Sequence, residues 1–157
     1  MSATLNLAER ARRALEDAGF EPDFPPQAAA EVRRAEKLVA TADRDLTHLL
    51  WSSIDNEDSR DLDQLEYAEP GPQNSIRLLL GIADVATYVA PGSAVDQRAA
   101  QNTVSIYTAG RTFHLLPEEL STGRTSLNEG ESRLAVIVEM LVQADGEVLE
   151  PKVYEPG

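Results

Sequence analysis

The segment from Ile54 to Glu69, IDNEDSRDLDQLEYAE, carries seven carboxylates in sixteen residues and a single basic side chain, Arg60. Like charges this close together repel, and they destabilise a fold unless they stay in water or share a cation. The seven acidic residues are Asp55, Glu57, Asp58, Asp61, Asp63, Glu66 and Glu69. A chain that contains this segment must therefore keep it at the surface, as a solvated loop or as a cation site.

The overall charge narrows the range of partners. The chain has 157 residues with 14 Lys and Arg against 27 Asp and Glu, which gives a formal net charge of −13. Such a chain cannot coat a phosphate backbone or an anionic membrane by net charge alone, so a nucleic acid must be met by a local patch or by bound cations. With 42% hydrophobic and 26% charged residues, the composition is that of a globular domain and not of a disordered segment.

Several kinds of site are excluded by residue counts. The chain has no cysteine, which excludes disulfides, a thiolate metal site and a cysteine nucleophile. Its two histidines, His48 and His114, are too few for a multi-histidine zinc site. No apolar run approaches the roughly 20 residues that a bilayer span needs, and the N-terminus lacks a signal peptide's apolar core. We therefore expect no membrane contact and a cytoplasmic location.

The pattern of apolar residues changes along the chain from helical to extended. Residues 1–45 indicate a helical N-terminal region, with helices expected over about 5–18 and, opened by Pro26, over about 27–41. Residues 46–157 are mainly extended. The expected elements there are strands at 51–54, 62–69 and within 75–89, a helix over about 93–102 capped by Ser93, a helical turn begun by Pro117, and a closing hairpin turned at Asp145-Gly146. The fold class predicted is α+β, a helical head followed by a mixed, mainly antiparallel sheet with short helices.

Three of the acidic residues are spaced as candidate metal ligands. Asp55 ends a short apolar stretch, a polar loop follows, and Asp61 and Asp63 are two residues apart at the start of the next strand, where an extended chain points them to the same side. Oxygen ligands of this kind suit Mg²⁺ or Mn²⁺ better than zinc. A solvated acidic loop explains the same residues, and a calcium loop fits them poorly because Arg60 occupies the position that requires glycine. The residues alone leave these alternatives open.

The order of motifs resembles one family, the RNB catalytic domain of ribonuclease II and ribonuclease R. The resemblance covers about residues 43–155. Its blocks are RDLTHLLWSSIDNEDSRDLDQLEY, IADV at 82–85, PGSAVDQRAAQNTVSIY, LLPEELSTGRTSLNEGESRLAVIVEM and the closing hairpin. The resemblance implies a 3′-to-5′ exoribonuclease that uses Mg²⁺, with Mn²⁺ as the alternative ion, to hydrolyse single-stranded RNA to nucleoside 5′-monophosphates.

The resemblance also implies roles for particular residues. Asp55, Asp61 and Asp63 match three of four family aspartates that hold the metal, and Asp61 and Asp63 are the predicted catalytic pair, with Asp63 the one on which the chemistry depends most. The fourth family aspartate falls at Gln64, whose amide carries no charge and should weaken one metal site. Tyr107 matches the aromatic residue that stacks on the base at the RNA 3′ end.

The match corresponds to the N-terminal part of the family domain only, and residues 46–157 are assigned to that part. The sequence is therefore expected to be a fragment of a longer protein, with an apolar strand face, Leu134, Val136, Val138, Met140 and Val142, left without a partner. We expect the 157 residues alone to cleave RNA poorly or not at all. The alternative is a non-catalytic RNA-binding remnant of the same family, in which Gln64 and the missing half have removed turnover. The oligomeric state is not predicted.

Overall fold

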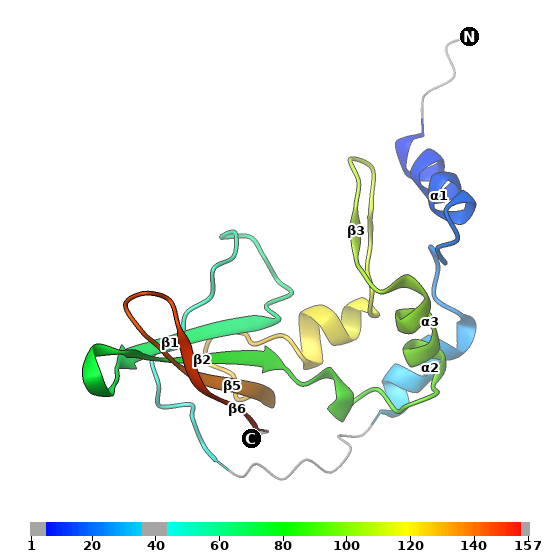
Figure 1. Cartoon of the computed structure of the whole chain (residues 1–157). Coiled ribbons are helices and arrows are strands. Elements are labelled where there is room, and N and C mark those ends of the chain that lie inside the picture. The colour runs from blue at the N-terminus through cyan, green and yellow to red at the C-terminus, as the bar shows by residue number, and fades with distance from the viewer. Residues whose placement is uncertain (1–5, 36–43, 155–157) are drawn as a thin grey trace. The chain divides into compact units, whose positions relative to one another are not determined.

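A computed structural model describes residues 6–35 and 44–154 of the chain (Figure 1). The described residues form two compact units, each built from two separate stretches of sequence. Residues 6–35 and 88–119 make the first unit, and residues 44–87 and 120–154 make the second. No helix of the described stretches is both long and apolar enough to cross a bilayer.

The first unit contains three helices and a short hairpin. The helices are α1 (Leu7–Asp17), α2 (Pro26–Arg34) and α3 (Ala94–Asn102), and the hairpin joins β3 (Ile106–Tyr107) to β4 (Thr112–Phe113). Local capping explains where α1 and α3 begin, because the side chains of Asn6 and Ser93 each accept a hydrogen bond from a first-turn amide. The predicted cap at Ser93 and the opening of α2 at Pro26 are confirmed.

A buried arginine holds the first unit together. Arg98 on α3 is 2% exposed, and its guanidinium lies 3.8 Å from the centre of the Phe24 ring. It donates hydrogen bonds to four backbone carbonyls, those of Glu21, Asp23, His114 and Leu115. Burial lowers the pKa of Arg98, although a guanidinium stays charged in proteins. Removing this side chain would take a donor from all four carbonyls, of which that of Glu21 keeps a second donor in the Asn102 amide.

Two further contacts tie the helices of this unit to its other parts. The Glu31 carboxylate on α2 accepts hydrogen bonds from the amides of Ala94 and Val95 at the start of α3, where a helix favours negative charge. Gly110, in the turn between β3 and β4, lies so close to α1 that a Cβ there would stand 2.7 Å from the Ala8 amide nitrogen. Only glycine permits that approach.

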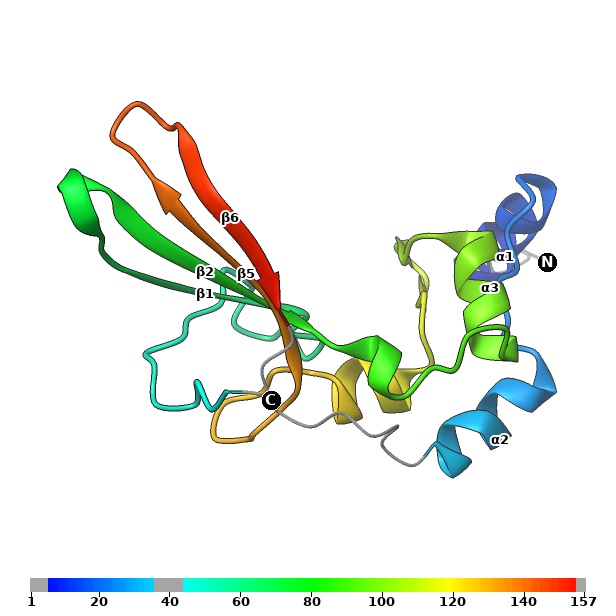
Figure 2. The ribbon, with the colours of Figure 1, turned by 60° about the horizontal axis from the view of Figure 1, so that its bottom comes forward.

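The second unit is built on a four-stranded antiparallel sheet with strand order β1-β2-β5-β6, seen side by side in Figure 2. The strands are β1 (Gln64–Pro70), β2 (Ile76–Ala83), β5 (Ala135–Val142) and β6 (Val148–Tyr154). Each of the three pairings is antiparallel, and the predicted fold class is confirmed. The predicted turn at Asp145-Gly146 is also found, with Gly146 at a φ of +88° that favours glycine.

The two faces of this sheet differ. Side chains directly opposite in the register share a face, so Leu65, Gly81 and Ile137 lie on one face together with Leu79. We call this the inner face, because Leu79 and Ile137 are 0% and 2% exposed. The opposite face carries the alternate residues of each strand and is called the outer face. Apart from Arg77 and Glu139 on the inner face, both faces of β2 and β5 carry apolar residues, which is typical of strands that need cover on both sides.

Several predicted elements differ from the structure. No strand forms at 51–54; instead Ser52 makes an isolated bridge to Glu66, and the flanking Leu50 and Ile54 are 88% and 87% exposed. An apolar stretch with a single bridge and no buried face cannot extend into a strand. The helical turn expected from Pro117 is a π-helix over Glu119–Arg124, and the β3–β4 hairpin was not predicted. Residues 36–41 of the second expected helix lie outside the described residues.

Candidate active site

The acidic segment is a loop closed at its base. The amide of Ser52 donates to the carbonyl of Glu66 at 3.0 Å, and the amide of Glu66 donates back to the carbonyl of Ser52 at 2.7 Å. All three candidate ligands, Asp55, Asp61 and Asp63, lie between these two residues. The bridge therefore gathers the candidate residues into a single loop at one end of the sheet.

The second half of this loop is anchored from a distant part of the sequence. Ser126, which is 1% exposed, accepts a hydrogen bond from the amide of Leu62 at 3.1 Å and donates to the carbonyl of Arg60 at 2.9 Å. The amide of Leu127 donates to the carbonyl of Leu62 at 2.8 Å. These bonds hold the backbone between Arg60 and Asp63 in place, so the aspartates on either side of Leu62 start from a fixed main chain.

The three aspartates have different surroundings. The carbonyl of Asp63 accepts a hydrogen bond from the amide of Ala83 at the end of β2, at 2.9 Å, while its side chain is exposed. Asp61 is half-buried, and Asp55 is exposed on the first limb of the loop. The anchoring bonds described above act on the second limb, which carries Asp61 and Asp63.

The positions of the acidic side chains decide whether this loop could hold a metal ion as it stands. A divalent cation such as Mg²⁺ needs several oxygen ligands converging on one point. Within residues 6–35 and 44–154, no group of three or more acidic or histidine side chains is placed to hold a metal. The expected meeting of Asp55, Asp61 and Asp63 around one point is therefore corrected: as they stand, the three carboxylates are not gathered so that they could hold an ion. Their roles as ligands and catalytic residues stay predictions.

Gln64, which stands at the fourth aspartate of the family pattern, has a local partner. Its side-chain amide donates to a carboxylate oxygen of Glu66 at 2.6 Å. The two residues are alternate positions on β1 and so share a face of the strand. An aspartate at position 64 could not donate this bond and would face a second negative charge instead.

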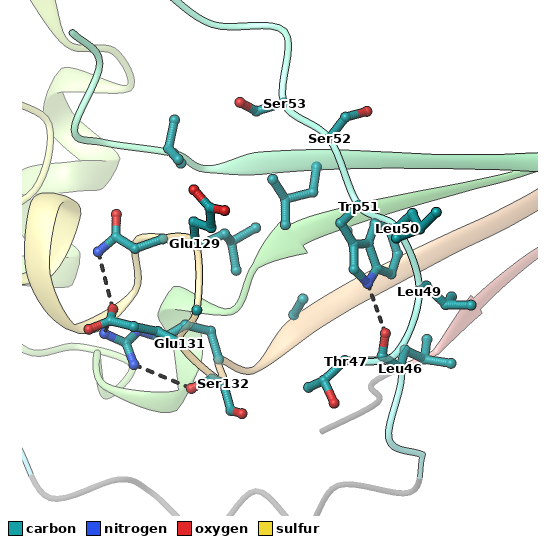
Figure 3. Close-up of a pocket in the computed structure, with 18 of the residues that line it drawn as sticks. Leu46, Thr47, Leu49, Leu50, Trp51, Ser52, Ser53, Glu129, Glu131 and Ser132 are labelled. Carbon is teal, nitrogen blue, oxygen red and sulfur yellow. Dashed lines mark hydrogen bonds and ion pairs between the residues drawn. The ribbon is translucent and has the colours of Figure 1, made fainter. Parts of the chain in front are cut away.

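A pocket of about 680 Å³ lies beside the acidic loop on the inner face of the sheet (Figure 3). Trp51 stands on one side, with its indole Nε1 donating to the carbonyl of Leu46 at 2.9 Å. Glu129 and Glu131 stand on the other side. Leu62, between the two anchored aspartates, also lines the pocket. Its floor is mainly apolar, and its charged side chains are Glu129, Glu131 and Arg133, of which Arg133 pairs with Glu131.

An ionic network stabilises the inner face further along the strands. Arg77 donates to Glu69 at 2.6 Å and to Glu139 at 2.9 Å, while Tyr67 and Tyr154 donate their hydroxyls to Glu69 and Glu139. The hydrogen bond from Arg77, with a smaller effect from Tyr154, lowers the pKa of Glu139 to about 2. Glu139 is 16% exposed, so water screens this pair little. The network fixes the alignment of β1, β2, β5 and β6.

Tyr107, the predicted base-stacking residue, lies on β3 in the first unit and is 69% exposed. The three aspartates belong to the second unit. Asp84, in the block IADV, accepts hydrogen bonds from the amide and hydroxyl of Thr87 and so orders the backbone after β2.

Sequence reasoning missed the anchor made by Ser126. Its hydroxyl bonds the loop from 66 positions further along the chain, and its only local signal is the polar stretch Ser121 to Ser126 after Leu120. A contact of that sequence separation cannot be found from periodicity or turn chemistry.

The chain is similar to known proteins of one family. The family model described as the RNB domain matches residues 43–156. The chain is similar to ribonuclease R of Acidithiobacillus ferrooxidans, with 38% identity over 137 residues that cover 85% of this chain and 31% of the relative. It is similar to ribonuclease R of Escherichia coli strain K12, with 36% identity over 135 residues that cover 85% of this chain and 17% of the relative.

The fold of this chain is also similar to solved structures. Mycoplasma genitalium RNase R in complex with ribose-methylated single-stranded RNA superimposes with a TM-score of 0.82 and 26% identity, covering 96% of this chain and 24% of that one. The yeast pseudonuclease Ssd1 shares the fold, with a TM-score of 0.51 and 19% identity over 59% of this chain. The chain thus spans less than a third of the length of these ribonuclease R proteins.

Proposed function

This chain belongs to the RNB domain family, and we propose from that membership that it forms the acidic part of a 3′-to-5′ exoribonuclease, which hydrolyses RNA to nucleoside 5′-monophosphates. The observation that carries the proposal is the acidic loop itself. It lies within the matched region, is closed by Ser52 and Glu66, and presents Asp61 and Asp63 from a backbone anchored by Ser126. Carboxylates held on a fixed main chain are suited to position a reacting phosphodiester through cations.

The activity is proposed for a complete catalytic domain. The relatives carry more than two thirds of their length outside the matched region. The net charge of −13 also argues that basic residues which grip single-stranded RNA are supplied by other parts of such a protein. We expect the 157 residues alone to cleave RNA poorly or not at all, and RNA hydrolysis by the purified chain in Mg²⁺ would contradict this.

Metal dependence is part of the proposal. It is supported by the chemistry of Asp55, Asp61 and Asp63, since carboxylate oxygens are the ligands that Mg²⁺ and Mn²⁺ prefer, and by the family resemblance. The three side chains are not gathered in this structure, so binding of an ion by all three would require them to move together. Tyr107 is proposed to stack on a base of single-stranded RNA, a contact that tolerates any sequence. A cytoplasmic location is proposed on the sequence alone and can be tested by cell fractionation.

The test uses this chain extended by the remainder of the Acidithiobacillus ferrooxidans ribonuclease R catalytic domain, with decay of 5′-labelled single-stranded RNA as the readout. Asp63→Asn should retain RNA binding and lose cleavage by about 10² or more, because the group that positions the reacting phosphate is neutralised. Asp58→Asn is the matched control, an exposed carboxylate in the same loop outside the family pattern. An equal loss of RNA cleavage in both variants, or no loss in either, would refute the assignment.

A non-catalytic RNA-binding remnant is the second candidate. It is favoured by Gln64, which replaces a charged ligand of the family pattern with an amide already bonded to Glu66. The two candidates separate in one experiment on the extended chain. Mg²⁺ binding that disappears in Asp61→Asn, without RNA decay in the unmodified protein, supports the remnant; decay with release of 5′-monophosphates supports the enzyme.

A further inference from the structure

The outer face of the four-stranded sheet has a continuous apolar surface. Every residue that β2 and β5 present on this face is aliphatic or methionine, and the register places them directly opposite one another. The eight residues are Ile76, Leu78, Leu80, Ile82, Val136, Val138, Met140 and Val142. Val148 and Val153 of β6 extend the surface beyond β5.

This surface is open in the described part of the chain. Ile76, Ile82, Val148 and Val153 are 52%, 41%, 48% and 69% exposed, whereas Leu79 and Ile137 on the inner face are almost fully buried. The other six outer-face residues of β2 and β5 are half-buried. Monomeric soluble proteins rarely leave apolar patches of this extent in water, because each exposed aliphatic side chain forfeits roughly 1.5–3 kcal/mol of burial.

The comparisons indicate what the occupant is. Mycoplasma genitalium RNase R matches 96% of this chain with only 24% of its own length, so most of such a protein is polypeptide that this chain does not contain. The family match reaches residue 156, just after β6, and so includes the strands that carry the open face.

Charge points to the same occupant. The chain has a net charge of −13, and an enzyme that holds RNA needs basic residues. A polypeptide that completes the domain must therefore bring positive charge, and it would be attracted to this acidic chain before the apolar surfaces meet. A second copy of the chain would instead bring another −13.

We propose that the outer face is the docking surface for the part of a ribonuclease R catalytic domain that follows the matched region. That part would pack an apolar layer against Val138, Val153 and their neighbours. This inference rests on the proposed function. The ionic network on the inner face fixes the strands from one side, so the sheet offers a pre-aligned surface to the incoming layer. The completed domain would then have a sheet covered on both faces, as its apolar strands require.

The test exploits the absence of cysteine from this chain, and any cysteine in the joined part is replaced by serine so that one introduced thiol is unique in both proteins. Val153→Cys is made in the 157-residue chain and in the same chain joined to the following part of Acidithiobacillus ferrooxidans ribonuclease R, and its rate of labelling by a maleimide is measured in both. We expect labelling at least about tenfold slower in the joined protein. Glu147→Cys, in the exposed turn of the same hairpin, is the control and should label at similar rates in both.

Three outcomes would overturn the inference. They are equal labelling of Val153→Cys in the two proteins, slowing of Glu147→Cys by the same factor, and protection in the short chain that disappears on dilution, which would identify a second copy as the occupant.

A second variant tests the docking surface by stability, without a label. Val153→Asp should lower the melting temperature of the joined protein, whereas Val104→Asp, at a residue 50% exposed in the first unit, should lower it less; equal effects would contradict the proposal.

RNA decay by the same joined protein separates this inference from the proposed function. Protection at position 153 without RNA decay supports the docking surface and refutes the exoribonuclease. Decay with position 153 still open supports the exoribonuclease and refutes the docking surface.

Discussion

Glu139 is the carboxylate whose charge contributes most clearly to the sheet of the second unit. Arg77 and, to a smaller extent, Tyr154 lower its pKa from 4.5 to about 2, although burial acts in the opposite direction. One pKa unit corresponds to about 1.4 kcal/mol, so the ionised form contributes about 3 kcal/mol to the free energy of unfolding. Glu139→Gln removes that charge and leaves Arg77 with Glu69 as its remaining ionic partner.

The pH dependence follows from the direction of the shift. Because the folded pKa is lower than the unfolded one, the stabilisation is fully present above the unfolded value near 4.5 and is lost as the pH falls toward 2. About 1.4 kcal/mol of it should be gone at pH 3.5. Wild type should therefore be more stable than Glu139→Gln by about 2–3 kcal/mol at pH 7, and the difference should narrow by about 1.4 kcal/mol at pH 3.5.

Urea unfolding followed by tryptophan fluorescence measures this difference, because the single tryptophan, Trp51, lies in the same unit as Glu139. Glu147→Gln, in the exposed β5–β6 turn, is the matched control and should change stability by less than about 0.5 kcal/mol at either pH. A difference between wild type and Glu139→Gln that stays constant from pH 7 to pH 3.5 would refute the linkage argument.

Three further outcomes are expected. Arg98→Met should destabilise the first unit by about 3 kcal/mol or more, seen as faster amide exchange throughout α3, because four backbone carbonyls lose the donor that a buried guanidinium supplies; unchanged exchange would contradict the bonding. Gly110→Ala should speed exchange in α1, since its Cβ meets helix backbone, while Gly123→Ala, with open space around it, should not. Gln64→Asp should lower the melting temperature without metal by placing two carboxylates together, and Mg²⁺ should raise it more than in wild type; an equal Mg²⁺ response in both would argue against a cation near Glu66.

The parts of the fold that the sequence predicts well are those set by neighbouring residues. Ser93 caps α3 and Pro26 opens α2 because each acts on amides within one helical turn, and Asp145-Gly146 turns the hairpin because glycine accepts its positive φ. The strand predicted at 51–54 is wrong for the opposite reason. A strand depends on a partner elsewhere in the chain, and there Ser52 alone finds one.

The candidate site likewise has features that the sequence predicts and features that it does not. The acidic loop and its aspartates can be read from composition and spacing, and their chemical roles came from the family resemblance. The anchoring of Arg60 and Leu62 by Ser126 depends on contacts across more than sixty positions, which no local pattern encodes.

Because each unit is assembled from two separated stretches, neither can be excised as one continuous peptide. A ribosome delivers the chain from its N-terminus, so α1 and α2 emerge long before α3 and the hairpin that complete their unit near residue 119. Strands β1 and β2 are made in that interval, yet β5 reaches them only after a further fifty or so residues, at a cost in loop closure. Vectorial synthesis thus favours the helical unit closing first, with an incomplete sheet waiting as an aggregation-prone intermediate that chaperones would have to shield.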